Sequence, residues 1–136
     1  MQAVYCDPEV MRFIPGGSLV PGDVRRILDR HVAANEDGDV GFYAVEERAS
    51  GAVVGEVGFG IFDTGEREIG WTLARAFWGR GFATEAVREC LAADARPVVA
   101  VIDPENEPSL RLAERVGLRM REQRVVRGRA HVVYET

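Results

Sequence analysis

A glycine-rich turn near the middle of the chain has the features of an anion-binding site. Gly79 and Gly81 lie within Trp78–Ala86, a segment that joins an expected strand to an expected helix. Glycines allow unusual backbone dihedral angles and bring backbone N–H groups close to a ligand. The start of a helix adds unpaired N–H donors and the positive end of the helix dipole. A strand, a glycine turn and a helix in this order suit a pyrophosphate group.

Two common nucleotide-binding motifs do not fit this turn. The dinucleotide fingerprint requires Gly or Ala at its last position, where this chain has Thr84. The strand before the turn also belongs to an expected antiparallel hairpin and not to a βαβ unit. A Walker loop needs a Lys, and all 17 basic residues of the chain are Arg. The same absence excludes a lysine nucleophile or Schiff base.

Two carboxylates lie where a shallow cleft is expected. Glu56 and Glu68 share the small-residue face of two neighbouring strands with Gly58, Gly60 and Gly70. A carboxylate at the edge of a cleft can act as a general base toward an amine, directly or through water. A half-exposed Glu on a strand is also commonly only solvated, and both interpretations stay open for each residue.

The hydropathy pattern predicts the elements that position these residues. Val53–Phe62 and Arg67–Leu73 alternate across a short turn, which is typical of an antiparallel hairpin. Ala83–Ala93 has the apolar spacing of an amphipathic helix. The other expected elements are a short helical piece at Asp7–Phe13, a helix at Pro21–Asn35 ended by Asp37-Gly38-Asp39, a strand at Phe42–Glu46, a buried strand at Val98–Ile102, a helix at Ser109–Val116 closed by Gly117, and a hairpin of Leu118–Val126 and His131–Glu135.

This order of elements predicts one α+β domain over residues 1–136. The sheet is expected to be mixed and mostly antiparallel, with flanking helices. A chain of 136 residues suits a single core, and no apolar run approaches the roughly 20 residues that span a membrane. The first 16 residues carry Asp7 and Glu9 and do not resemble a signal peptide, so we expect a cytoplasmic protein with no membrane partner.

The charge distribution argues against nucleic-acid binding. Residues 1–110 hold 10 Arg and 19 acidic residues, whereas residues 111–136 hold 7 Arg and 3 acidic residues. A nucleic-acid-binding domain needs an electropositive surface, and the main body here is acidic. The basic end could bind an anionic small molecule or be a solvated face. Cys6 and Cys90 form no Cys-x-x-Cys pair, and neither His has a ligand-spaced partner, so no metal site is expected.

Two neighbouring stretches resemble the acetyl-CoA signature of the GNAT N-acetyltransferases. They are Glu68–Leu73 and Phe77–Ala86, and they are most similar to the Rim-type branch, named for ribosomal-protein N-terminal acetyltransferases. Asp103–Ser109 with Leu112–Leu118 resembles the second motif of that branch, and the opening Asp7–Phe13 matches it too. The resemblance covers nearly the whole chain in the order of the family.

The resemblance implies acetyl-CoA as cosubstrate and no metal. The strands at 67–73 and 98–102 would splay apart around the pantetheine arm, which would hydrogen-bond to the backbone as an added strand does. The pyrophosphate would lie on the N–H groups of the glycine turn, and Arg80, Arg111 or Arg115 could reach the CoA phosphates or be solvated. The cofactor-binding residues implied are Leu73, Ala74, Gly79, Arg80, Gly81, Phe82, Ala83, Thr84 and Asn106.

The resemblance further implies transfer of acetyl to a primary amine, a protein N-terminus or a small molecule, by direct attack on the thioester. Glu68 matches the position where several family members carry the base, and Glu56 is the second candidate. A backbone N–H near Leu73 would hold the developing oxyanion. Many members use a Tyr to reprotonate the thiolate, but the corresponding helix of this chain has none, so Ser109 would take that role. Ser109 also suits the N-cap of a helix.

Two departures from the family pattern leave alternatives open. The chain begins within what would be the first helix, so the first strand of the fold is expected to be missing, and only six residues separate Leu91 from Val98. A homodimer partner could cover the exposed edge. A catalytically weak or inactive acyl-CoA-binding module, acting as a sensor or an oligomer component, is the alternative function. The sequence does not identify the amine.

Overall fold

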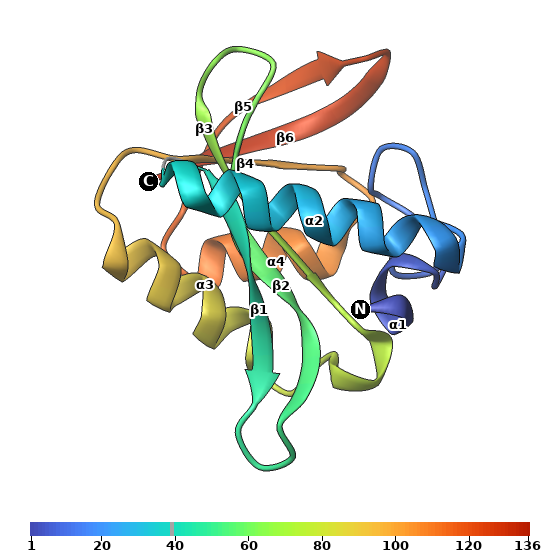
Figure 1. Ribbon diagram of the computed structural model, residues 1–136. Helices are drawn as coiled ribbons and strands as arrows, with labels where there is room; N and C mark the ends of the chain where they lie inside the picture. The colour runs from blue at the N-terminus through green and yellow to red at the C-terminus, as the bar shows by residue number, and fades with distance from the viewer. Residues whose placement is uncertain (39) are drawn as a thin grey trace.

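A six-stranded sheet with helices on both faces forms the frame of the molecule (Figure 1). The computed structural model describes residues 1–38 and 40–136. The strand order is β1-β2-β3-β4-β6-β5, and every neighbouring pair is antiparallel except β3 and β4. The elements are α1 (Gln2–Tyr5), α2 (Pro21–Asp37), β1 (Gly41–Glu47), β2 (Ala52–Ile61), β3 (Arg67–Leu73), the 3-10 helix η1 (Arg75–Phe77), α3 (Phe82–Ala93), β4 (Val99–Ile102), α4 (Glu107–Arg115), β5 (Arg119–Val126) and β6 (Arg129–Glu135).

The predicted α+β sheet flanked by helices is therefore confirmed, and β3 has the predicted bounds. Pro21 and the left-handed Gly38 bound α2, which runs two residues longer than the pattern indicated. Asp39, expected to help end that helix, lies outside the described residues. Within the described part of the chain, no helix is long and apolar enough to cross a membrane.

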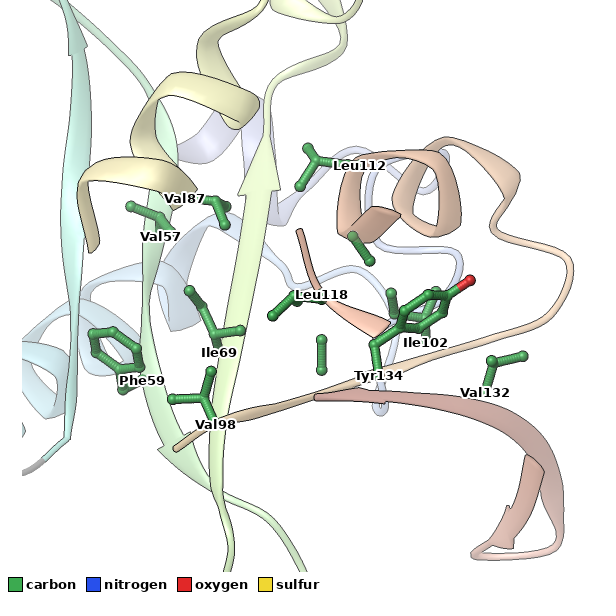
Figure 2. Close-up of a cluster of buried hydrophobic side chains, with 12 residues drawn as sticks. Val57, Phe59, Ile69, Val87, Val98, Ile102, Leu112, Leu118, Val132 and Tyr134 are labelled. Carbon is green, nitrogen blue, oxygen red and sulfur yellow. The ribbon is translucent and has the colours of Figure 1, made fainter. Parts of the chain in front are cut away.

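The main core fills the face of the sheet covered by α3 and α4. Alternation along β2 and β3 turns Val57, Phe59 and Ile69 to this face, where Val87 of α3 and Leu112 of α4 meet them (Figure 2). Val87 is completely buried. The apolar stripe predicted for α3 packs here as well, so the spacing identified both the helix and its buried side.

Helix α2 lies on the opposite face of the sheet, where it packs against β1 and crosses the strands in Figure 1. This face carries Glu56 and glycines in place of large side chains. Position 58 has no room for a side chain because the backbone of β1 passes close to it. A Cβ at Gly58 would lie 2.1 Å from the Gly41 carbonyl oxygen. The side chain of Phe42 fills part of the space, with ring carbons 3.3 Å from where a Cβ of Gly70 would be.

Strands β3 and β4 separate along most of their length, as the resemblance implied. Their only register pair among the described residues is Glu68 with Val99. The Ala74 N–H donates to Val54 of β2 at 2.8 Å, so alternation turns the backbone groups of Trp71 and Leu73 away from β2 and toward the gap. The gap is therefore lined by backbone donors and acceptors that no neighbouring strand uses.

Two predicted helix positions need correction. Asp7–Phe13 forms turns and not a helix, and the helix of this region is the earlier α1. A helix does not continue through this segment because Pro8 has no N–H to donate and the Asp7 carboxylate accepts the Glu9 N–H at 2.9 Å. The helix expected from Ser109 begins at Glu107 instead. Its N-cap is Asn106, and Pro108 falls in the first turn, where a missing N–H costs nothing.

Candidate functional site

Two pockets meet where β3 and β4 separate. The first, which we call the turn pocket, extends from the glycine turn at Gly79 and Gly81 along Leu73. The second, the acidic pocket, extends over the floor between Glu56 and Glu68. A single connected cleft therefore joins the possible anion site to the two carboxylates. The residues that line both pockets are Phe13, Ile14, Trp71, Thr72, Asn106 and Ser109.

The glycine turn presents unpaired N–H groups to the turn pocket. Gly79 and Gly81 have positive φ angles of 70° and 88°, which explains why glycine occupies both positions. Gly81 caps α3, and its carbonyl accepts the Glu85 N–H at 3.0 Å. The N–H groups of the first turn, from Phe82 to Thr84, thus have no acceptor within the helix. This geometry is compatible with the anion site that the sequence predicts.

The three Arg side chains expected near the phosphates differ in their surroundings. Arg111 and Arg115 line the turn pocket, and Arg115 has no ion pair with any residue that the structure describes. Arg111 pairs with Glu107 at 2.9 Å. The Arg80 guanidinium instead pairs with Glu47 at 2.6 Å and lies over the Phe77 and Phe82 rings. Arg115 is therefore the best placed of the three for an anion.

Leu73 and Ala74 differ in what their backbone can offer. The Ala74 N–H is bonded to β2, and its carbonyl accepts the Phe77 N–H at 2.9 Å, so both of its groups are used within the chain. The Leu73 carbonyl accepts the indole N–H of Trp78 at 2.8 Å. The Leu73 N–H points toward the gap and is the donor that a ligand there could meet.

Asn106 and Ser109 are brought together at the start of α4, beside the junction of the pockets. The Asn106 side chain accepts the Ser109 N–H at 3.3 Å and so caps the helix. The interpretation of Ser109 as the N-cap is wrong, because Ser109 lies in the first turn. Its hydroxyl oxygen instead accepts the indole N–H of Trp71 at 3.3 Å. That bond leaves the hydroxyl hydrogen available to donate into the cleft.

Glu68 reaches from β3 into the gap. Its carboxylate accepts the backbone N–H of Val101 on β4, which lies beyond the point where the strands pair. Burial, and then the nearby charge of Asp63, raise its pKa to about 7; the Val101 N–H and Arg127 partly oppose the shift. A carboxyl group with a pKa near 7 can both take and release a proton at neutral pH.

Glu56 is the more buried of the two acids, with a residue exposure of 7%. The Tyr5 hydroxyl donates a hydrogen bond to its Oε2 atom, and His31 Nε2 lies 3.6 Å from the same oxygen. Burial raises the pKa of Glu56, and the Tyr5 hydrogen bond opposes that shift. Burial also lowers the pKa of His31, so its ring is neutral at pH 7.

Sequence reasoning missed several residues of the acidic pocket. Tyr5 is 51 residues from Glu56, and no pattern in the chain connects the two. Asp63 and Arg127 form two hydrogen bonds, at 2.8 and 3.2 Å, between the β2–β3 and β5–β6 turns. Arg127 has a positive φ of 50°, as expected before Gly in a tight hairpin turn, but a two-residue turn does not indicate which distant side chain it will meet.

Comparison with known proteins agrees with this arrangement. A family model described as an acetyltransferase (GNAT) domain matches residues 1–119. An uncharacterized N-acetyltransferase, p20 of Bacillus licheniformis, is 28% identical over 96% of this chain and 80% of its own length. The structure of a putative GnaT-family acetyltransferase from Bordetella pertussis is 32% identical, has a TM-score of 0.78, and covers 94% of this chain and 84% of that chain.

A structural neighbour of the Rim type was solved with a CoA derivative. RimJ of Mycobacterium smegmatis, in complex with CoA-disulfide, is 25% identical with a TM-score of 0.67. The alignment covers 82% of this chain and 59% of that chain. The match to the family model, residues 1–119, includes the glycine turn, Glu56 and Glu68.

Proposed function

Because the chain belongs to the acetyltransferase (GNAT) family, we propose that it transfers the acetyl group of acetyl-CoA to a primary amine by direct attack on the thioester. The relatives are named as acetyltransferases, which supports an enzyme over a binding module. The observation that carries the proposal is the single cleft in which the turn pocket and the acidic pocket meet between β3 and β4.

The turn pocket suits the CoA part of acetyl-CoA. The N–H groups at the start of α3 would bind the pyrophosphate, with Arg115 as the nearest unpaired cation. The pantetheine arm would lie along the gap side of β3, toward which the backbone groups of Trp71 and the N–H of Leu73 point. This placement brings the thioester to the junction, beside Trp71 and Ser109.

The acidic pocket would supply the amine and the base. Glu68 lines the acidic pocket on β3 and would accept the proton of the amine, directly or through one water. The free amine then forms the new N–C bond while negative charge develops on the thioester oxygen. The Leu73 N–H would stabilise that charge.

The C–S bond then breaks and leaves a thiolate. The Ser109 hydroxyl would give its proton to the sulfur, because its oxygen already accepts from Trp71 and its hydrogen remains available to donate. The proton lost from the amine remains on Glu68 until it passes to solvent. Atoms and charge balance: one amide and one thiol leave the site.

The binding step is tested first by titration of the purified protein with acetyl-CoA. One molecule should bind per chain, and ligand at 100 times its Kd should stabilise the fold by about 2.7 kcal/mol, a rise in Tm of several degrees. Calorimetry and a thermal melt measure the two effects, and release of the CoA thiol with a panel of amines measures turnover. A folded protein that binds no acetyl-CoA would contradict the proposal.

Ser109→Ala should lower kcat about tenfold with little change in acetyl-CoA affinity. The effect is smaller than the usual 10²–10⁴ for a proton-transfer group, because a thiolate is a good leaving group with a conjugate-acid pKa of about 8.5. Ser109→Thr keeps the hydroxyl and should restore most of the rate. If Ser109→Ala keeps the full kcat, the hydroxyl is not the proton donor. Steady-state kinetics on both variants decide.

A further inference from the structure

The indole of Trp71 is held in place at the junction of the two pockets. The side chain is half-buried and packs against the main core, opposite Val57 in the β2–β3 register. An indole has one polar atom, Nε1, whose hydrogen can donate but which cannot accept. Because packing fixes the ring, this N–H has a fixed direction, and it points at the Ser109 hydroxyl oxygen 3.3 Å away.

This hydrogen bond lies where the two halves of the sheet have separated. Trp71 follows Glu68, the residue at which β3 still pairs with β4, by three positions. Ser109 belongs to α4, which comes after β4 along the chain. Trp71 and Ser109 both line the turn pocket and the acidic pocket. The bond therefore joins β3 to α4 at the place where the thioester would lie.

The backbone around Ser109 competes weakly for its hydroxyl hydrogen. A Ser in a helix commonly donates to the carbonyl group three or four residues earlier. The carbonyl three residues before Ser109 is that of Asn106, which already accepts the N–H groups of Ser109 and Leu110 at 3.0 and 3.1 Å. An acceptor at the junction therefore has an advantage over this carbonyl.

Donation by the indole makes the Ser109 hydroxyl a better donor. The indole N–H occupies one side of the oxygen and so limits the directions that the hydroxyl hydrogen can take. A hydrogen bond received by an oxygen also polarises its own O–H bond, which strengthens the bond that this group donates. Both effects favour transfer of the hydroxyl proton to an acceptor in the cleft.

We propose that Trp71 is a positioning residue for the acetyl transfer: its indole N–H holds the Ser109 oxygen so that the hydroxyl hydrogen points at the sulfur of the departing thiolate. As the C–S bond breaks, the proton passes from Ser109 to the sulfur, and solvent water returns a proton to Ser109. The indole keeps its own hydrogen throughout. The inference rests on the proposed function for the role of Ser109, but the bond itself can be measured without turnover.

The kinetic test combines substitutions at both ends of the bond. Trp71→Phe keeps an aromatic ring and removes the N–H, so kcat should fall about threefold with little change in acetyl-CoA affinity. The double variant Trp71→Phe/Ser109→Ala should be no slower than Ser109→Ala alone, about tenfold, because the indole acts only through the hydroxyl. Independent effects would multiply to about 30-fold. Trp78→Phe is the matched control: its N–H bonds to the Leu73 carbonyl, so any loss that it causes should multiply with that of Ser109→Ala.

A second test detects the bond by NMR in the resting protein, with both Trp residues in place. The chain has two Trp residues, so ¹⁵N labelling gives two indole N–H resonances, which Trp71→Phe and Trp78→Phe assign. Ser109→Ala should move the Trp71 resonance upfield and speed its hydrogen exchange, whereas Ser109→Thr keeps the acceptor and should leave both nearly unchanged. The Trp78 resonance should stay in place in both Ser109 variants.

The outcomes separate this inference from the proposed function. A Trp71 resonance that does not respond to Ser109→Ala would overturn the inference, as would a double variant about 30-fold slower than the unmodified protein. Either result would leave the acetyl transfer itself intact. Absence of thiol release from the unmodified protein with every amine would instead contradict the proposed function, whatever the NMR test shows of the bond.

Discussion

Glu68→Gln should lower kcat/KM for the amine by about 100-fold or more, with acetyl-CoA affinity unchanged. General-base catalysis contributes about 10²–10⁴ to a rate, and Gln can accept the Val101 N–H but cannot take up a proton. The side chain keeps its size, so the gap between β3 and β4 keeps its shape. Initial rates of thiol release, with calorimetry for acetyl-CoA, measure the two quantities.

The pH dependence gives the same prediction a second readout. Burial raises the pKa of Glu68 to about 7, and only the ionised form is a base. The kcat/KM of the unmodified protein should therefore rise as the pH increases through about 7, and Glu68→Gln should lack this rise. Glu46→Gln is the matched control, because it removes the charge of an exposed Glu on β1. It should keep both the kcat/KM and its pH dependence. If Glu68→Gln retains the full rise in activity, another group is the base.

Gly58→Ala should destabilise the fold by about 3 kcal/mol or more. The added Cβ would lie 2.1 Å from the Gly41 carbonyl oxygen and 2.5 Å from the Phe42 Cα, and both are backbone atoms that cannot rotate away. Strand β1 would have to move off β2, and Phe42 would move with it. Urea unfolding should show a lower midpoint, and Tm should fall by roughly 10 °C.

Gly60→Ala is the control for this substitution on the same strand and the same face. A Cβ there meets no atom within 4 Å, and the residue does not have a positive φ. The free energy of unfolding of the Gly60→Ala variant should change little, or increase by about 0.4–1 kcal/mol, because Ala restricts the unfolded chain more than Gly does. Equal stability of the two variants would show that β1 can shift away from Gly58 at no cost.

Patterns within one element were sufficient to predict the fold and the glycine turn before α3. The α3 spacing identified a helix and its buried side, and the glycines of the turn have the positive φ angles that anion binding uses. Alternation also placed Glu56 and Glu68 correctly on the small-residue face. In each case, residues close in sequence determine the outcome.

What the sequence did not predict depends on contacts between distant elements. The Tyr5–Glu56 hydrogen bond and the Asp63–Arg127 pair join segments 51 and 64 residues apart, and neither has a local signal. The N-cap of α4 was misplaced for a different reason. Asn106 and Ser109 are both good caps, and Pro108 at the second helical position is what favours the earlier start.

The single register pair between β3 and β4 separates the sheet into two groups of strands. Strands β1 to β3 pair through runs of seven residues, and β4 to β6 pair through runs of four and seven, but among the described residues only Glu68 with Val99 joins the two groups. A ligand whose amide groups bond to β3 takes the place of a missing central strand. Such a ligand binds the folded sheet, so part of its binding energy would appear as added stability where a shared core, with Ile69 on one side and Ile102 on the other, holds the two groups of strands together.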